Sequence, residues 1–486
     1  MAFVGPEQLG HRRTEVIDKR EIMNFSRELG LAPNVIEKDY ILGWLLAGIT
    51  RHPGLSSSWI FKGGTCLKKC FFETYRFSED LDFTITDPDQ LNSEFLTKAF
   101  TEIAEWIYET AGVEIPKELI RFDVYQNPHG GTSVEGRISF RGPMQRERDL
   151  TRVRLDLTAD EVLVLEPVMR KVHHPYTDNP AGGIEVRCYS FEEVFAEKIR
   201  ALKERLRPRD LYDVIHLYRH DNLRPDRQVV METLHDKCEF KGIAVPTVQD
   251  FIDHAGRDEL QAEWGNMLGH QLPALPPFAQ FWNELAAVFK WLEGELEEIE
   301  RPAFPVSISG VDPAWRAPAM VQSWGSAVPL EIIRFAAANR LCVNLAYDGA
   351  TRLIEPYSLR RTRDGHLVLH ATRHNSGEAR SYRVDRIQGA EATTEPFIPR
   401  YAIEFTASGP LSAPPTRRTA MGPRLSTRPR IRLAKRSSSG PTYIYKCSYC
   451  GKRFYRKRFD SGLNPHKDKR GYPCSGSTGY YVTTKY

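Results

Sequence analysis

The chain has 486 residues, enough for roughly three domains of about 150 residues each, so one small domain is excluded. No run approaches the roughly 18 uncharged apolar residues of a membrane span, and the first residues lack a secretory-signal layout. We therefore expect a cytoplasmic protein with no membrane partner. In that reducing compartment, a local cluster among the eight cysteines indicates a metal site rather than disulfides.

The formal charge of +4 conceals an asymmetry along the chain. Residues 411–486 hold 18 Lys or Arg against 2 Asp or Glu, whereas the first 410 residues hold 49 basic and 61 acidic residues. The tail is therefore near +16 and the body near −12. Such a basic block is typical of contact with nucleic-acid phosphates. For residues 406–440, rich in Ser, Pro and Arg, a flexible basic linker explains the charge equally well.

The first 300 residues alternate between helix-like and strand-like segments. Asn34 can cap a helix in which apolar residues recur every fourth position, and residues 276–299 form another helix pattern that ends before Pro302. Near the start, a glycine pair at 63 and 64 separates the apolar strand WIF from the helix-like LKKCFFETY. Glycines at such a turn let backbone N–H groups approach a phosphate, although alone the pair is more often only a turn.

Two carboxylates follow the glycine turn. Asp80 and Asp82 open the strand-like LDFTI, and residues two apart on a strand share a face. Because like charges held together repel, the pair indicates a cation, and Mg²⁺ prefers such ligands. Asp156, in the alternating segment RVRLDLT, supplies a third carboxylate on a neighbouring strand. The alternative makes Asp156 a solvent-facing residue of an edge strand.

The strings FKGGTCLKK, RFSEDLDF and AEKIRALKERLRPRDLYDV resemble the AbiEii/AbiGii-type nucleotidyltransferase toxins, a branch of the polymerase-β-like nucleotidyltransferase superfamily. The resemblance covers about residues 20–300. It implies a core of mixed sheet and helices that uses Mg²⁺ and a nucleoside triphosphate to modify an acceptor, a tRNA 3′ end in some members. It also implies a role in toxin–antitoxin or abortive phage defence. Asp80, Asp82 and Asp156 then bind Mg²⁺, and Asp156 also takes a proton from the acceptor.

The third string contributes two further candidates. Ser190 and Glu193 form a capping box that begins a helix, and Lys198 falls within its apolar stripe. That lysine either reaches water along its stem or points into the cleft. Pro208 suits the first turn of the next helix and places Asp210 near its start. The resemblance makes Lys198 and Asp210 catalytic residues.

The nucleotide is expected to contact residues around the glycine turn. Thr65 departs from the serine of many relatives but keeps a hydroxyl for phosphate. Lys62 and Arg76 flank the metal motif and are equally consistent with surface charge. The predicted nucleotide-binding residues are Lys62, Gly63, Gly64, Thr65, Arg76 and Ser78.

A second module follows a Pro- and Gly-rich linker at 301–327. Alternating segments and Asp-Gly turns from residue 341 on predict a small all-β module. Residues 328–405 resemble a WYL-type domain, which implies an SH3-like barrel for sensing nucleic acid or a nucleotide ligand. The Trp-Tyr-Leu of that family is replaced by aliphatic residues within 366–369. The candidate ligand residues, which a solvated barrel face would also explain, are Tyr357, Arg360, Arg361, Arg383 and Arg386.

The last 46 residues, 441–486, form a cysteine cluster similar to a zinc finger. Cys447 and Cys450 form a Cys-x₂-Cys knuckle, and His466 and Cys474 follow. These four ligands suit tetrahedral, structural Zn²⁺. Basic and aromatic residues beside the knuckle suit a nucleic-acid backbone, with Arg453, Arg456 and Lys457 as candidates.

The sequence thus predicts a multidomain α+β protein. Its expected parts are a nucleotidyltransferase core with a helical region (1–300), a linker (301–327), a WYL-like β module (328–405), a basic linker (406–440) and a zinc-ribbon or zinc-finger module (441–486). The preferred hypothesis is an Mg²⁺-dependent nucleotidyltransferase toxin that releases pyrophosphate and acts on tRNA, other RNA or protein, with a separate antitoxin as a partner. The alternative is a non-enzymatic WYL and zinc-finger regulator on a degenerate transferase scaffold.

Overall fold

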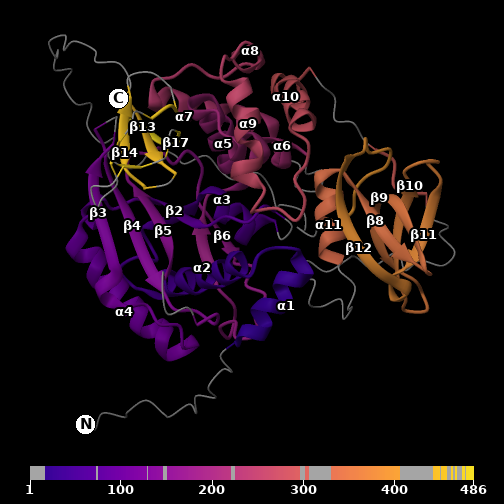
Figure 1. Cartoon of the computed structure of the whole chain (residues 1–486), viewed down its shortest axis with the longest axis horizontal. Coiled ribbons are helices and arrows are strands. Elements are labelled where there is room, and N and C mark those ends of the chain that lie inside the picture. The colour runs from indigo at the N-terminus through magenta and orange to yellow at the C-terminus, as the bar shows by residue number, and fades with distance from the viewer. Residues whose placement is uncertain are drawn as a thin grey trace, which may run out of the picture. The chain divides into compact units, whose positions relative to one another are not determined.

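The structure is a computed structural model that divides the chain into two compact units, Met1–Arg418 and Thr419–Tyr486 (Figure 1). In the first unit it describes residues 17–72, 75–127, 130–145, 150–219, 225–295, 301–305 and 330–405. In the second it describes residues 442–448, 450–456, 461–463, 466–467, 473–474, 476 and 478–485. Residues 306–327 of the predicted linker at 301–327 lie outside these residues, as does the predicted linker at 406–440.

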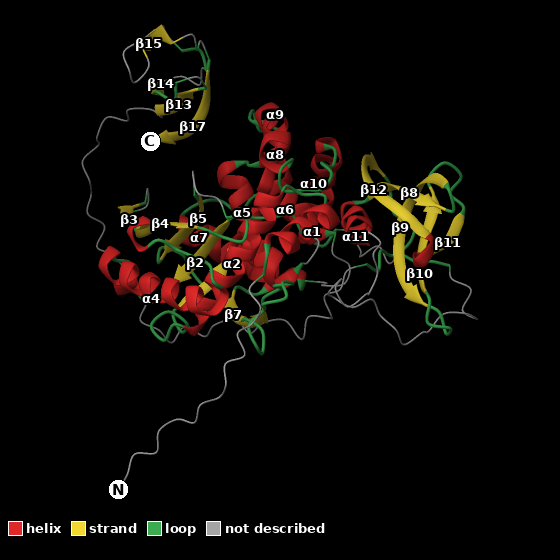
Figure 2. Cartoon of the chain, turned by 60° about the horizontal axis from the view of Figure 1, so that its bottom comes forward, coloured by secondary structure: helices red, strands yellow, loops and turns green. Residues whose placement is uncertain are grey.

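A mixed sheet forms the centre of the first unit (Figure 2). Within the described residues it has seven strands in the order β3-β4-β5-β2-β1-β7-β6. Two adjacent pairs, β2 with β5 and β1 with β7, are parallel. The strands are β1 (Trp59–Lys62), β2 (Asp80–Ile85), β3 (Ile120–Gln126), β4 (Thr132–Phe140), β5 (Thr151–Thr158), β6 (Val168–Lys171) and β7 (Glu185–Cys188).

Helices surround this sheet and confirm the predicted core of mixed sheet and helices. Those before the last strand are α1 (Lys19–Leu29), α2 (Pro33–Arg51), α3 (Gly63–Cys66) and α4 (Ser93–Ala111). The helical region that follows consists of α5 (Phe191–Arg205), α6 (Pro208–Tyr218), α7 (Arg227–Lys241), α8 (Val248–Ile252), α9 (Arg257–Leu268) and α10 (Phe278–Glu293). Among the described helices, none is long and apolar enough to cross a membrane.

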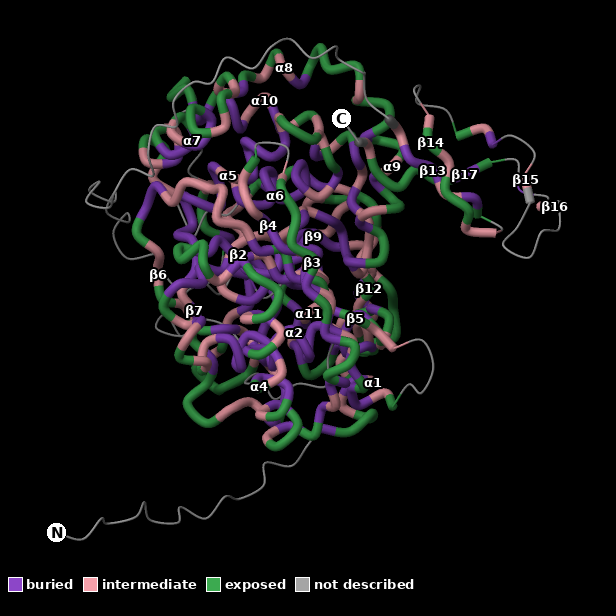
Figure 3. Tube along the Cα trace, turned by 90° about the vertical axis from the view of Figure 1, so that its left-hand side faces the viewer, coloured by how far each residue is buried: buried purple, intermediate pink, exposed green. Residues whose placement is uncertain are grey.

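The sequence pattern of β5 explains how the sheet acquires two different faces. Val153, Leu155 and Leu157 are buried, whereas Arg154 and Asp156 alternate with them and are exposed. The buried side chains join one large apolar core to which α2 and α4 also contribute (Figure 3). The opposite face of this strand is therefore free to carry charged residues.

The ends of three helices test the sequence analysis. The predicted cap at Asn34 was wrong, because α2 begins at Pro33 and its N-cap is Ala32. The helix within 276–299 is confirmed, but it ends at Glu293, where Gly294 adopts a left-handed conformation. Helix α5 begins after Ser190, whose hydroxyl accepts a hydrogen bond from the Glu193 N–H.

The β module of the first unit begins with helix α11 (Leu330–Asn339). Its strands are β8 (Leu341–Tyr347), β9 (Ala350–Arg361), β10 (Leu367–Arg373), β11 (Ala379–Arg383) and β12 (Ile387–Pro396). They form a sheet in the order β11-β10-β9-β8-β12. Asp348 and Gly349 both have positive φ in the β8–β9 hairpin, as a type I′ turn requires. The predicted all-β segments are thus confirmed, while the SH3-like barrel remains a prediction.

The second unit contains short strands around a small core. Strands β13 (Thr442–Cys447), β14 (Arg453–Arg456) and β17 (Gly479–Lys485) form one sheet, and β15 (His466–Lys467) pairs with β16 (Pro473–Cys474). Tyr445, Cys447 and Leu463 make up its buried core.

Candidate functional site

The predicted glycine turn lies where β1 passes into α3. Gly63 has a φ of +80°, a conformation that side chains other than glycine rarely adopt. A Cβ atom at this position would lie 2.0 Å from Oδ2 of Asp82. A Cβ atom on Gly64 would lie 2.7 Å from Nη2 of Arg76. The turn therefore needs glycine both for its backbone conformation and for the approach of these charged groups.

The three predicted metal-binding aspartates lie on one face of the sheet. Asp82 is paired directly with Asp156 across the parallel strands β2 and β5, and Asp80 is paired with Arg154. Residues paired across strands project to the same side, as do residues two apart on one strand. Asp80, Asp82 and Asp156 consequently face the same way. Asp156 is exposed to solvent, as the alternative held, but β5 lies between β4 and β2 and is not an edge strand.

The electrostatics of the trio are those of neighbouring anions. Desolvation, followed by the charges of Asp82 and Asp80, raises the pKa of Asp156 to about 7. Desolvation also raises the pKa of Asp82, which Lys62 opposes and Asp80 reinforces. Three carboxylates that disfavour one another's charge fit a divalent cation, which would relieve the repulsion. The carboxylate oxygens of the three aspartates do not all lie within 4.8 Å of one another in this structure.

Two predicted phosphate ligands have partners within the protein. The hydroxyl of Thr65 donates to the backbone carbonyl of Asp80 and so joins α3 to β2. Lys62 forms an ion pair with the carboxylate of Glu161, which also accepts from the hydroxyl groups of Thr84 and Tyr189, each at 3.0 Å. In this structure the Thr65 hydroxyl and the Lys62 ammonium therefore bind other residues of the protein, and both contacts hold the glycine turn in place.

Arg76, Lys198 and Asp210 meet in a buried ion network. Arg76 binds Asp213 through two hydrogen bonds of 2.7 and 2.8 Å. Lys198 Nζ lies 2.6 Å from Asp213 Oδ2 and 3.5 Å from Asp210 Oδ1. Arg205 closes the network with two hydrogen bonds to Asp210, at 2.7 and 2.8 Å. The arrangement excludes the alternative of a surface charge for Arg76, because its side chain is only 3% exposed.

The network lies beside the aspartates. The charges of Lys198 and Arg205 both lower the pKa of Asp82, and Ser78 Oγ is 3.1 Å from the ideal Cβ position of Gly64. Five predicted polar residues, Asp80, Asp82, Lys198, Asp210 and Ser78, are thus gathered around the glycine turn. The sequence analysis did not assign Arg205 or Asp213. The signal for Asp213 was present in the RDLYD segment, because Asp210 and Asp213 are three apart and share one face of α6.

Arg209 is a further cation that the sequence analysis left unassigned. It lies in the first turn of α6, and its Nε atom is buried without a hydrogen-bond partner. Desolvation and the charge of Arg76 lower its pKa, whereas Asp80 and Glu79 raise it. A partly buried guanidinium whose charge interacts with Asp80, and whose Nε atom has no hydrogen-bond partner, suits an incoming anion.

The candidate ligand residues of the β module are less available than predicted. The ring of Tyr357 is fully buried among Phe304, Phe397 and Tyr401, so it offers no face for stacking. Its hydroxyl donates to Glu355 at 3.1 Å. The other candidates are arginines, of which three form ion pairs: Arg360 with Glu404, Arg383 with Asp385, and Arg386 with Asp348. Arg361 is exposed.

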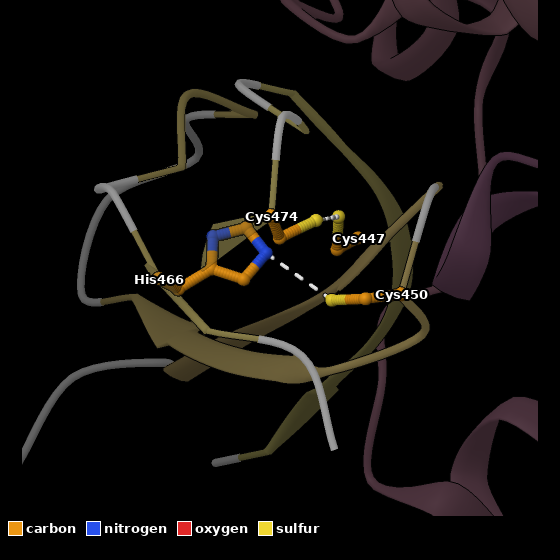
Figure 4. A group of neighbouring side chains, drawn as sticks. All are labelled: Cys447, Cys450, His466 and Cys474. Atoms are coloured by element: carbon orange, nitrogen blue, oxygen red, sulfur yellow. Dashed lines mark hydrogen bonds between the residues drawn. The ribbon is translucent and has the colours of Figure 1, made fainter. Parts of the chain in front are cut away.

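The predicted zinc ligands converge in the second unit (Figure 4). The ligand atoms of Cys447, Cys450, His466 and Cys474 all lie within 4.8 Å of one another. Cys450 Sγ is 3.2 Å from His466 Nε2, and Cys447 Sγ is 3.8 Å from Cys474 Sγ. Three sulfur atoms and one imidazole nitrogen at this spacing fit tetrahedral Zn²⁺.

The basic candidates of this unit separate onto two faces. Arg453 is exposed beside Lys446, whereas Arg456 is paired with Tyr443 on the other face and donates to the Gly462 carbonyl at 2.6 Å. Lys457 lies outside the described residues.

A mixed sheet that brings a glycine turn beside paired aspartates is the core of a nucleotidyltransferase. The sequence profile described as "Nucleotidyl transferase AbiEii toxin, Type IV TA system" matches residues 44–289, half of the chain. The chain therefore belongs to the AbiEii nucleotidyltransferase toxin family. The WYL domain profile matches residues 329–392.

Two bacterial proteins are among the solved structures that match this chain. The nucleotidyltransferase toxin MenT4 of Mycobacterium tuberculosis H37Rv has 17% identity and a TM-score of 0.41, over 58% of this chain and 91% of that chain. JHP933 of Helicobacter pylori has 15% identity and a TM-score of 0.34, over 55% of this chain and 95% of that chain. No curated protein matches the chain.

Proposed function

We propose that the protein transfers a nucleotide from a nucleoside triphosphate to a hydroxyl of an RNA acceptor, with tRNA as the preferred class. The direct pairing of Asp82 with Asp156 beside the Gly63 turn carries this proposal. Asp80, Asp82 and Asp156 would hold Mg²⁺, which supplies charge stabilisation at the attacking and leaving oxygens. The triphosphate would lie along the glycine turn, where Arg209 offers an unused donor.

The reaction is an in-line displacement at the α-phosphorus. The acceptor oxygen forms the new P–O bond, the bond between the α-phosphorus and the bridging oxygen breaks, and pyrophosphate leaves. Asp156 takes the proton of the acceptor hydroxyl, and its pKa of about 7 suits that role near neutral pH. Lys198 and Arg205 offset the negative charge around Asp82.

The test uses the purified full-length protein with Mg²⁺, each α-labelled nucleoside triphosphate and total tRNA. Label should enter RNA with one triphosphate and disappear with Asp80→Asn/Asp82→Asn. Asp123→Asn is the matched control, because Asp123 is an exposed carboxylate of the same sheet that pairs with surface Arg137. Label found in protein instead of RNA would show that the acceptor is a protein and not RNA. In cells, growth arrest that is equal for Asp80→Asn/Asp82→Asn and Asp123→Asn, together with no labelled product in the assay, would favour the regulator hypothesis.

The pH profile tests the role of Asp156. Because its pKa is raised to about 7, the carboxylate is protonated below that pH and can neither bind Mg²⁺ nor accept a proton. At limiting Mg²⁺ concentration, activity should rise as the pH increases through about 7. Saturating Mg²⁺ should shift this rise to lower pH, since the cation favours the ionised form. A profile that is unchanged by Mg²⁺ concentration would contradict this assignment.

The remaining parts of the proposal concern the protein's partners. Family membership supports a separate antitoxin and a role in toxin–antitoxin or phage defence in the cytoplasm. The WYL match and the basic second unit support contact with nucleic acid or a nucleotide ligand. A structural Zn²⁺ in the second unit is supported by its Cys₃His cluster.

A further inference from the structure

The sheet β14-β13-β17 in the second unit has one face that points away from the Cys₃His cluster, on which only Ile444 of the paired residues named below is buried. Tyr445 and Cys447 are buried on the side of the Cys₃His cluster. On the opposite side, Lys446 is paired with Arg453 of β14 and with Tyr480 of β17. Cross-strand partners project to the same face, so these three side chains form one row across the sheet.

A second row lies two residues further along the sheet. Ile444 is paired with Tyr455 of β14 and with Thr483 of β17. The register of β17 shifts between these rows, which leaves Val482 unpaired and keeps both rows on one side. Tyr455 and Tyr480 thus stand on the two outer strands of a single face.

The exposure of these rings is unusual for side chains of this size. Tyr455 is 60% exposed and Tyr480 is 52% exposed, whereas Tyr445 on the other face is 1% exposed. Packing against the Cys₃His cluster therefore explains why Tyr445 is buried, but it does not explain why Tyr455 and Tyr480 stand on the surface. Two aromatic rings held apart on a rigid sheet are available to stack on flat groups.

The charge of the face restricts what it can bind. None of the described residues between 442 and 485 is acidic, and Lys446 and Arg453 form no ion pair with a described carboxylate. Positive side chains between exposed aromatic rings match a phosphate backbone that carries unpaired bases. A duplex fits less well, because its bases are already stacked on one another and present only their edges.

We propose that the face formed by Lys446, Arg453, Tyr455 and Tyr480 binds single-stranded nucleic acid. Two unpaired bases stack on Tyr455 and Tyr480, and the ammonium and guanidinium groups contact the phosphates between them. This inference rests on the proposed function for its biological role, because it assigns the surface that holds the RNA acceptor. The binding itself requires no nucleotide transfer.

Fluorescence anisotropy with the full-length, zinc-loaded protein tests this proposal, using short single-stranded RNA, single-stranded DNA and a duplex as probes. Single strands should bind more tightly than the duplex. Tyr455→Ala and Tyr480→Ala should each weaken binding at least about fivefold, while the phenylalanine variants retain it. Arg453→Gln should lower the salt dependence of binding by a slope of about 0.7. Comparison of the RNA and DNA arms shows whether the 2′-hydroxyl contributes.

Controls separate this binding from folding and from catalysis. Tyr108→Ala is the matched control, because Tyr108 is also 60% exposed but lies on α4 of the other unit. Zinc content is measured for every variant, so a loss of binding counts only where the zinc is retained. Asp80→Asn/Asp82→Asn should bind normally even though transfer is lost. Unchanged affinity in both tyrosine variants, or a preference for the duplex, would overturn the proposal.

Discussion

At the scale of single residues, Gly63 shows how closely backbone and charge are matched in the candidate active site. Its φ of +80° turns the chain from β1 into α3, and its missing side chain leaves room for the Asp82 carboxylate. Two independent constraints thus meet at one position. A side chain here would both strain the turn and displace a proposed metal ligand.

We predict that Gly63→Ala lowers nucleotidyl transfer about 100-fold, the effect of a ligand displaced by about 1 Å. Because alanine is strained at this positive φ, the substitution should also lower the free energy of unfolding by about 1–2 kcal/mol. Gly182→Ala is the matched control, because Gly182 has a φ of +87° with nothing within 4 Å of its ideal Cβ position. It should show the same loss of stability in urea denaturation with normal activity. Equal transfer activity of the two variants would contradict the proposed role of Asp82 in the reaction.

At the scale of elements, the buried ion network joins segments that are distant in sequence. Arg76 precedes β2, Lys198 lies in α5, and Asp210 and Asp213 lie in α6. Desolvation raises the pKa of Asp213, but the charges of Arg76 and Lys198, followed by their hydrogen bonds, lower it by more, which keeps this fully buried carboxylate ionised. The network therefore fixes α5 and α6 beside the aspartate face.

Removal of the Asp213 charge should destabilise this ion network. We predict that Asp213→Asn lowers the free energy of unfolding by about 3–5 kcal/mol, because Arg76 and Lys198 then remain buried without their partner. Glu105→Gln is the control, since Glu105 and Lys117 form an exposed pair, and its cost should stay below about 1 kcal/mol. Urea denaturation measures both variants. Similar losses in the two would show that the network contributes no more than a surface pair.

At the scale of the whole molecule, the chain consists of two units with different sources of stability. The first unit has a large apolar core that includes residues of α2, the central sheet and α11. Among the described residues of the second, the buried core cluster consists of Tyr445, Cys447 and Leu463, and Ile444 is buried as well. Small cores of this kind commonly depend on a structural metal, and the Cys₃His cluster is suited to bind one.

We therefore predict one zinc ion per chain and two separable unfolding transitions. Cys450→Ser should abolish zinc binding and the transition of the second unit, while the first unit changes by less than about 0.5 kcal/mol. Cys238→Ser is the matched control, because Cys238 is a buried thiol of α7 outside the cluster. Elemental analysis and calorimetry measure the two effects. Zinc retained in Cys450→Ser would contradict the proposed ligand set.

The sequence alone determined the local features of this protein. The alternation in RVRLDLT predicted the two faces of β5, Pro208 marked the first turn of α6, and the cysteine spacing indicated the cluster of the second unit. Each of these depends on backbone periods or on neighbouring residues, which a single segment contains. The local signal at Asn34 failed, because α2 begins one residue earlier at Pro33.

Only the tertiary structure decided which distant groups face one another. Parallel pairing of β2 with β5 brought Asp82 beside Asp156, and helix packing placed Asp213 in contact with Arg76. Burial removed the ring of Tyr357 from any stacking surface. Such contacts join segments whose order along the chain does not reveal their distance in space, so they follow from packing of the whole core and not from any local period.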